Sequence, residues 1–385
     1  MKKFIAVWLA LLTLTLTMAA CNPTTPEETS TEEESTTEAP VVETTAEVET
    51  TMETTTEEET TMAEETTLEE TTTEETTTEE TTTEAPKSYP VLYQIMPHKD
   101  VLQNCYLIKT ANGKYILIDG GDAGQDAVRG YLYRQLSEIM EIRPGQAVEI
   151  EAWFLTHMHD DHVTEFTMMP EGQRFPIKVN NVYMNFPSRE FMNQSEGGAS
   201  AYLYDGVQAA YDRFIGEGEF EKTGGKTAFT GDVIEIDGVK IEILMTVTDE
   251  ETESNINDTS MIFRVTMEGQ TILFLGDAYI PEGNRLLEQY GAELKADIVQ
   301  MAHHGQNGVT REVYEAIDPT MCLWPTPIWV FENNAGIYQT DEVRSWMADM
   351  DVKYHIVAGE HLTQSLTFPV DFDSLEEYPI RKVTN

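Results

Sequence analysis

The run His157-Met158-His159-Asp160-Asp161-His162 constrains this chain more than any other segment. It places three imidazoles and a carboxylate at the spacing His-x-His-x-Asp-His, and side chains of these types bind zinc and similar ions. The chain has 8 His among 385 residues, so composition alone does not account for the cluster. The run therefore predicts a site where these side chains converge on a divalent cation.

Residues 1–20 have the composition of an export signal. Two lysines precede a long apolar run, and small residues lead to Cys21. A Cys at this place resembles the lipobox of bacterial lipoproteins, whose Cys is lipidated. The resemblance implies a signal peptide at 1–20, a lipid anchor at Cys21 as the only membrane contact, and a location on the extracellular face of the cell membrane. The alternative is a transmembrane helix, for which the run is short.

Residues 21–88 are dominated by Thr and Glu. The stretch 22–86 has 22 Glu and no Lys, Arg or aromatic residue. Such a segment buries too little apolar surface to offset its ordering entropy, and its like charges keep it extended. We therefore expect a disordered tether that carries a single folded domain, residues 89–385.

The folded part is itself acidic. Outside the Thr/Glu stretch and the two N-terminal lysines, 47 acidic residues face 22 basic ones. Nucleic-acid binders usually have the opposite sign, because phosphate contacts dominate their affinity. The charge thus disfavours a nucleic-acid partner, although a metal site could draw a phosphate locally. Cys105 and Cys322 lie in apolar runs and are interpreted as buried free thiols, with an extracellular disulfide as the alternative.

Strand-like and helix-like segments alternate along the folded part. Two hairpins are predicted over 231–244 and 260–275, with turns at Asp237-Gly238 and Glu268-Gly269. This mixture favours two β-rich halves with helices outside, and polar loops at several strand ends could meet along one edge. Further strands are predicted over Val91–Ile95, Asn104–Lys109, Lys114–Asp119, Val148–Leu155, Asn180–Phe186, Ala296–Ala302, Met321–Trp324 and His355–Ala358, and helices over Ala127–Met140, Tyr202–Ile215, Gly283–Tyr290 and Asp341–Met350.

The polar groups at these strand ends are sufficient for a two-metal site. The first two histidines of the run can face one ion, and its last two residues can face a second. Two neighbouring cations lower the pKa of a shared water and stabilise attacking and leaving oxygens, which is hydrolytic machinery. The candidate ligands are His157, His159, Asp161, His162, Asp277 and one of His303 and His304.

The motifs, taken in chain order, resemble the metallo-β-lactamase superfamily over roughly residues 89–360. The order is closest to the hydrolase domain of ComEC-like DNA-uptake proteins and more loosely similar to surface phosphocholine esterases. The resemblance implies an α/β fold, an αββα sandwich with two divalent ions at one edge, Zn favoured and Mn the alternative. The motifs are Asp119-Gly120-Gly121, His157–His162, Asn257-Asp258-Thr259-Ser260, Leu275-Gly276-Asp277 and His303-His304-Gly305.

The resemblance also implies roles for single residues. His157, His159, Asp161, His162 and Asp277 would be ligands, and Asp161 would also take part in catalysis. Of the two adjacent histidines that follow, His303 is favoured as a ligand because it comes directly after the strand. His304 would then contact substrate or act as general acid, and the reverse assignment stays open. Asp119 is either a turn residue or the support of a ligand His.

One departure from the superfamily concerns the first metal ion. Most members supply a third His before the second hairpin, and this chain has Asn257-Asp258 there. Asp258 is interpreted either as an oxygen ligand or as an ordinary loop residue. Because oxygen ligands suit harder cations, the departure favours manganese or a weakly bound first ion.

The sequence thus predicts an exported, surface-anchored hydrolase in which a metal-bound hydroxide attacks an ester-like centre. A phosphodiester is favoured, so the expected partner is a small molecule or polymer that contains a phosphoester. One alternative keeps the fold and changes the bond to a β-lactam, lactone or thioester. Another is a surface binding module without activity, which the absent third His motivates.

Overall fold

The computed structural model describes residues 87–95, 101–121, 130–143, 146–168, 176–247, 255–360, 363–378 and 380. All of them belong to one compact unit, residues 81–385. The predicted signal peptide, Cys21 and the tether up to residue 86 lie outside the described residues. Every helix among the described residues is too short or too polar to cross a membrane.

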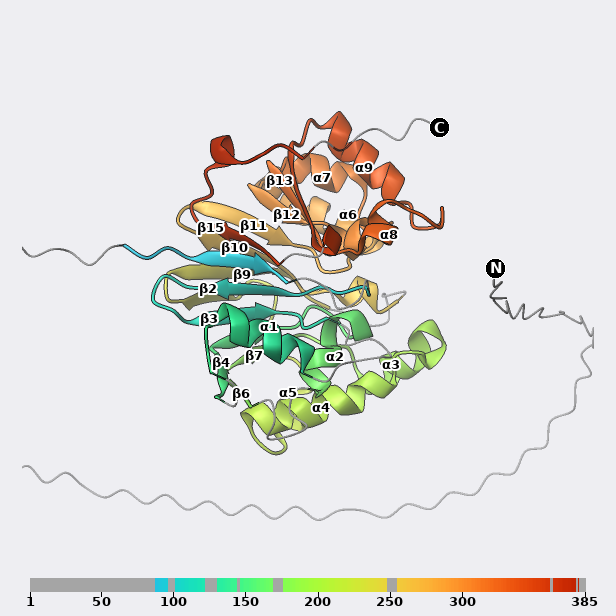
Figure 1. Ribbon diagram of the computed structural model, residues 1–385. Coiled ribbons are helices and arrows are strands. Elements are labelled where there is room, and N and C mark those ends of the chain that lie inside the picture. The colour runs from blue at the N-terminus through green and yellow to red at the C-terminus, as the bar shows by residue number, and fades with distance from the viewer. Residues whose placement is uncertain are drawn as a thin grey trace, which may run out of the picture. The chain divides into compact units, whose positions relative to one another are not determined.

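Two β-sheets pack face to face (Figure 1). The first has the strand order β15-β1-β2-β3-β5-β7 and the second β14-β13-β12-β11-β10-β9-β8, and each combines antiparallel with parallel pairs. The first consists of β1 (Val91–Gln94), β2 (Tyr106–Lys109), β3 (Tyr115–Ile118), β5 (Ala152–Phe154), β7 (Val182–Tyr183) and β15 (Gln364–Thr367). The second consists of β8 (Val233–Ile236), β9 (Val239–Met245), β10 (Ile262–Met267), β11 (Gln270–Phe274), β12 (Ile298–Gln300), β13 (Met321–Trp324) and β14 (Tyr354–Val357). A separate parallel pair joins β4 (Val148–Ile150) to β6 (Ile177–Val179).

Helices cover the outer faces of both sheets, green below the sheets and orange above them in Figure 1. This order of layers confirms the predicted αββα sandwich. On the side of the first sheet lie α1 (Tyr131–Ile139), α2 (Asp160–Met168), α3 (Arg189–Gln194), α4 (Tyr202–Ile215) and α5 (Glu219–Thr223). On the side of the second lie α6 (Ile280–Tyr290), α7 (Arg311–Ile317), α8 (Ile328–Phe331) and α9 (Thr340–Asp349). Short 3-10 helices include η1 (Ser195–Gly198), η3 (Asn257–Thr259) and η5 (Ala302–Gly305).

The core has three layers because the central strands are buried on both faces. In β3, Ile116 and Ile118 point between the sheets, whereas Leu117 points to the helices outside the first sheet. In β11, Ile272 likewise points between the sheets and Leu273 points to the helices outside the second. This alternation follows from the two-residue period of a strand. Burial of both faces accounts for the nearly continuous apolar runs in the sequence.

The two cysteines of the described part belong to opposite layers. Cys105 packs in the core outside the first sheet, and Cys322 packs in the core outside the second. Both are buried and free. The prediction of two buried thiols is therefore confirmed, and the sandwich between them rules out the alternative disulfide.

The predicted strand Val148–Leu155 is wrong as a single element. It is divided at Glu151 into β4, which pairs with β6, and β5, which lies between β3 and β7. The burial pattern changes at the same point, from alternating in β4 to fully buried in β5. By contrast, α4 has its predicted bounds, and both hairpins turn at the predicted Asp-Gly and Glu-Gly pairs.

Candidate metal centre

Strands from both sheets deliver polar side chains to one edge of the sandwich. In the first sheet, β5 leads to His157, and α2 begins three residues later at Asp160. In the second sheet, β11 leads to Gly276 and Asp277, and β12 leads to η5 with its two histidines. Gly276 has φ 55°, and a Cβ atom there would lie 2.9 Å from the Ser260 Oγ. The tight turn that aims Asp277 therefore requires glycine.

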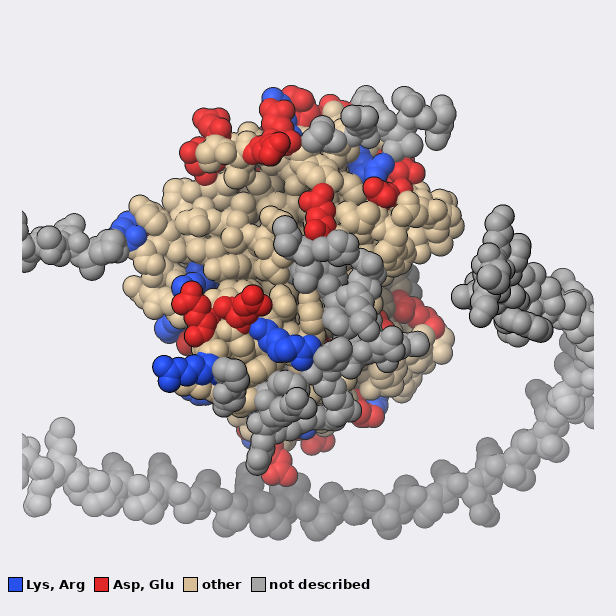
Figure 2. Space-filling view, in the orientation of Figure 1, with Lys and Arg blue, Asp and Glu red and all other residues tan. Residues whose placement is uncertain are grey.

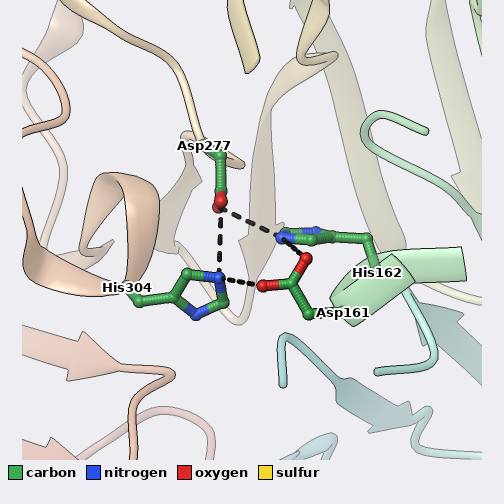
Figure 3. A group of neighbouring side chains, drawn as sticks. All are labelled: Asp161, His162, Asp277 and His304. Atoms are coloured by element: carbon green, nitrogen blue, oxygen red, sulfur yellow. Dashed lines mark ion pairs between the residues drawn. The ribbon is translucent and has the colours of Figure 1, made fainter. Parts of the chain in front are cut away.

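Four side chains meet at this edge and form a group that we call the quartet: Asp161, His162, Asp277 and His304 (Figure 3). One ligand atom of each lies within 4.8 Å of the others. The Asp277 carboxylate is central, with Oδ1 3.2 Å from His162 Nε2 and Oδ2 3.3 Å from His304 Nε2. The His304 Nε2 is also 2.9 Å from Asp161 Oδ2. The quartet thus draws residues from both sheets to one point.

Burial opposes charge on the quartet, but the mutual attraction of its members outweighs that effect. The carboxylates of Asp277 and Asp161 raise the pKa of His304 to about 10, and Asp277 with Asp119 raises the pKa of His162. The two imidazoles in turn hold the pKa of Asp277 well below its ordinary value. A divalent cation among these groups would replace the two imidazole protons, since ligating imidazoles are neutral.

The outward nitrogens of both quartet histidines face acceptors that have no proton to give. The His162 Nδ1 donates to Asp119 Oδ2 at 2.7 Å, and the His304 Nδ1 donates to the Pro325 carbonyl at 2.5 Å. We infer that each Nδ1 carries a hydrogen, so each Nε2 is available to a cation. Both Nε2 atoms and the Asp277 Oδ1 are buried and have no aligned hydrogen-bond partner among the described residues. Such a donor set fits a metal ion.

Asp119 is fully buried and acts as the support of His162. Its carboxylate also accepts from the Asn104 Nδ2 at 2.6 Å and from both the backbone nitrogen and the Oγ1 of Thr156 at 2.8 Å. With all these donors engaged, the carboxylate is fixed in place. Of its two interpretations, the structure favours support of a ligand His over a plain turn residue.

A second group, the histidine pair His157 and His159, lies beside the quartet. The His157 Nε2 is 3.1 Å from the His159 Nδ1, and the ring centroids of His157 and His162 are 4.1 Å apart. Thr156 uses its hydroxyl hydrogen on Asp119, so we infer that it accepts from the His157 Nδ1 at 3.2 Å. This assignment leaves the His157 Nε2 free to face a cation.

Distances within both groups match those between ligands of one ion. Two ligand atoms at 2.0–2.1 Å from a tetrahedral zinc ion are about 3.3 Å apart. Within the quartet the ion-pair separations are 2.9–3.3 Å, except for 3.9 Å between the His162 Nε2 and the Asp161 Oδ1, and the separation in the histidine pair is 3.1 Å. The quartet therefore fits one ion, and the histidine pair adds two nitrogens at ligand spacing beside it.

Of the two adjacent histidines, the structure places the second in the quartet and the first outside it. His304 belongs to the quartet, whereas the ring of His303 packs edge-on against Tyr279 with centroids 4.8 Å apart. Both histidines have left-handed backbone angles, with φ 48° and 57°. The chain therefore turns sharply after β12 and aims its second histidine inward. Burial lowers the pKa of His303, whose Nδ1 is among the buried atoms without a hydrogen-bond partner in the described part.

Asn257 and Asp258 are buried in η3, and neither belongs to the quartet. The Asp258 Oδ2 accepts from the Asn255 Nδ2 at 3.1 Å, and the Asn255 Oδ1 accepts from the Asp258 backbone nitrogen at 3.1 Å. The Asn257 side chain lies beside Tyr279, whose pKa is raised by burial. These contacts are those of a folded loop beside the centre.

Two supports of the site were not found from the sequence. Thr156 directly precedes the histidine motif. Because threonine is common at strand ends, the sequence alone does not indicate that it contacts a ligand histidine. Glu196, whose Oε2 accepts from the His159 Nε2 at 3.1 Å, lies 37 residues from that histidine. An isolated Glu before two glycines gives no spacing signal.

Comparison with known proteins gives one family. The family profile described as the metallo-beta-lactamase superfamily matches residues 98–319, more than half of the chain. A search of curated proteins found no match.

Solved structures with this fold are similar at low identity. The metallo-beta-lactamase fold protein YhfI from Bacillus subtilis is 11% identical with a TM-score of 0.38, and the alignment covers 72% of this chain and 98% of that one. CmlA, a diiron beta-hydroxylase from Streptomyces venezuelae, is 14% identical with a TM-score of 0.40, covering 74% of this chain and 55% of that one. Zn(2+)-bound PqqB from Methylobacterium extorquens is 13% identical with a TM-score of 0.33, covering 55% and 71%.

Proposed function

The chain belongs to the metallo-β-lactamase superfamily, and on that premise we propose that it is a metal-dependent hydrolase that acts on a phosphodiester. The observation that carries the proposal is the convergence of the quartet beside the histidine pair, with inward nitrogens and carboxylate oxygens at ligand spacing. Divalent ions bound there would activate a water and stabilise both the attacking and the leaving oxygens of an in-line displacement.

Different residues of the chain would bind the metal ions, orient the ligands and contact the substrate. The quartet, with Asp277 facing both of its histidines, would hold one ion, and the histidine pair would hold the other. Asp119 and the Pro325 carbonyl orient the quartet histidines from outside. His303 and Tyr279, which pack on each other at the edge of the centre, would contact the substrate. In this assignment His303 takes the substrate-side role and His304 is a ligand.

A phosphodiester is favoured because two adjacent ions suit the two oxygens that change charge in phosphoryl transfer. We propose that the substrate is a phosphoester-containing small molecule or polymer. Long nucleic acid is disfavoured, because acidic residues outnumber basic ones in the folded part. On the face shown in Figure 2, the described basic side chains are interspersed with acidic ones rather than joined in a continuous stripe.

The ligand types favour zinc, with manganese as the alternative. Together the two groups offer four imidazoles and two carboxylates and no sulfur. Imidazole suits zinc, whereas added carboxylate and water ligands suit manganese. The absence of a His at 257 and 258 leaves the pair with fewer nitrogen ligands than the superfamily usually provides, which favours a more weakly bound first ion.

We propose further that the enzyme is exported and anchored by Cys21. The basic and apolar composition of residues 1–20 supports the proposal. The 65 residues of 22–86 would reach about 200 Å if fully stretched, enough to carry the domain well away from a membrane. Labelling of expressing cells with a radioactive fatty acid should mark the wild-type chain and leave Cys21→Ser unmarked. Equal labelling of both would contradict the anchor.

Turnover of bis-p-nitrophenyl phosphate tests the proposed activity. We expect hydrolysis that a chelator abolishes and that added zinc or manganese restores, with Asp277→Asn as the inactive control. A chromogenic β-lactam, a lactone and a thioester are assayed on the same preparation. Chelator-sensitive turnover of one of these instead of the diester would contradict the proposed bond and establish the alternative hydrolase. Metal binding without any turnover would favour the binding module.

A further inference from the structure

Glu196 is the outer partner of the histidine pair. We propose that it is a positioning residue, which fixes the ring of His159 so that its Nδ1 faces the His157 Nε2. It thereby sets the affinity of the metal ion at the histidine pair, which we call the first ion. The inference rests on the proposed function, because it assigns a role within the same centre.

The geometry of the Glu196 carboxylate supports this role. Its Oε2 lies 3.1 Å from the His159 Nε2, and its Oε1 accepts from the backbone nitrogen of Ile256 at 3.3 Å. An ionised carboxylate only accepts, so the His159 Nε2 must donate. The neutral ring then keeps its lone pair on Nδ1, which lies 3.1 Å from the His157 Nε2. Glu196 thus selects the ligand atom of His159.

The second contact of Glu196 ties the pair to the loop in which the superfamily resemblance places a third His. Ile256 directly precedes η3, which contains Asn257 and Asp258. Glu196 therefore bridges the histidine motif and this loop, although it comes from neither. It lies in η1 with φ 52° and ψ 27°, next to Gly197, whose φ is 68°. This left-handed turn directs the carboxylate toward His159.

Each of the other three histidines also has an acceptor on its outer nitrogen: Thr156 for His157, Asp119 for His162 and the Pro325 carbonyl for His304. Glu196 completes this set for His159. It differs from the others in exposure, since 30% of its side chain is accessible to solvent whereas the Asp119 side chain is fully buried. Partners of this kind typically change metal affinity by about 10–100-fold. Loss of Glu196 should therefore lower the metal affinity at the histidine pair alone.

Metal titration of chelator-treated full-length protein tests the inference, with zinc and a competing chromophoric chelator. Glu196→Ala should weaken the lower-affinity class of binding by about 10–100-fold and leave the higher-affinity class unchanged. Glu196→Gln, which keeps an acceptor oxygen, should recover most of the loss. The matched control is Glu190→Gln, a surface acid of α3 that contacts Gln194, and it should leave both classes unchanged.

A second readout follows the ring itself. Nitrogen NMR of the metal-free protein above the pKa of His159 should show hydrogen on Nε2 in the wild type and a mixture of tautomers in Glu196→Ala. Two bound ions in the wild type with unchanged affinity and tautomer in Glu196→Ala would overturn this inference and leave the proposed function intact. Equal weakening of both classes together with a lower melting temperature would also overturn it. Failure of the wild type to bind zinc or manganese would overturn the proposed function as well.

Discussion

The quartet and the histidine pair lie side by side but are built differently. The quartet combines two imidazoles with two carboxylates, and its side chains are 0–16% exposed. The pair has two imidazoles, lacks a third histidine in the adjoining η3, and leaves 17% of the His159 side chain exposed. The quartet thus has more ligands and more negative charge than the pair. From this difference we expect two metal ions to bind with unequal affinities, the tighter one at the quartet.

The supports of the two groups follow the same division. The quartet is oriented by a buried carboxylate and a backbone carbonyl, neither of which can move without disturbing the core. The pair is oriented by a threonine hydroxyl and by Glu196, which reaches in from a turn between helices. A rigid support maintains ligand geometry before the ion arrives, so the quartet loses less free energy to ordering.

The largest expected effect comes from Asp277→Asn. This change removes the carboxylate that faces both quartet histidines, so we expect affinity at the higher-affinity class to fall by more than about 100-fold. Turnover should fall at least as much. Competition with a chromophoric chelator measures the affinity. Asp160→Asn, an exposed acid at the start of α2, is the control, and an equal loss there would contradict the assignment.

The next effect distinguishes the two adjacent histidines. His304→Gln should abolish the higher-affinity class of metal binding, because its Nε2 faces both quartet carboxylates. His303→Gln should keep both ions and reduce turnover of the diester, because His303 faces Tyr279 rather than the quartet. Metal content and steady-state kinetics of both variants show which of the two histidines is a metal ligand. The opposite pattern would restore the ranking that the sequence favours.

Asp119→Asn should act on both groups and so tests whether they are separate. Asp119 accepts from His162 and also from Thr156, which in turn contacts His157. We expect both classes of binding to weaken by about 10–100-fold, and the free energy of unfolding to fall by about 1–3 kcal/mol because a buried acceptor is replaced by a donor. Chelator competition and urea unfolding measure the two quantities. Weakening of one class alone would show that Thr156 does not couple the groups.

The last prediction concerns stability alone and not metal binding: His355 is a buried histidine outside the centre. Its Nδ1 accepts from the Trp324 Nε1 at 3.1 Å and its Nε2 donates to the Val352 carbonyl at 3.0 Å, so both nitrogens are satisfied. Burial lowers its pKa to about 4. Since the unfolded chain titrates near 6.5, the unfolded state binds more protons between these values, and stability falls as pH drops through that window.

This contribution should reach about 3 kcal/mol at pH 4. The difference in unfolding free energy between wild type and His355→Gln, measured by urea from pH 7 to pH 4, isolates it from other groups. Metal affinity at pH 7 should be the same in both proteins. If His355→Gln changed the metal affinity, hydrogen bonds on both ring nitrogens would not be a sufficient sign that a histidine is structural.

Much of the centre was predictable because its information is local. The spacing within His157–His162, the Gly before Asp277 and the position of both after apolar strands identify ligand types and their meeting edge. The αββα layers follow from runs buried on both faces, and the hairpins follow from their turn residues. In these cases neighbouring residues alone specify the geometry.

The remainder depends on contacts between distant segments. The selection of His304 over His303 depends on two left-handed residues after β12, which no hydrophobic pattern reveals. Glu196 reaches His159 only because α3 and α4 bring η1 to the motif. The break at Glu151 divides one apolar run between two sheets, since β4 has its own partner in β6. Pattern alone does not determine such pairings.

Unequal binding of two ions is tested most directly by the number and affinity of the ions that the wild-type chain binds. Chelator-treated protein is dialysed against a graded series of zinc concentrations, and bound zinc per chain is measured by mass spectrometry. We predict two ions of unequal affinity, of which the tighter is lost in His304→Gln and the weaker in His159→Gln. Uptake of no ion above trace, or of two ions with equal affinity that each variant weakens alike, would contradict it.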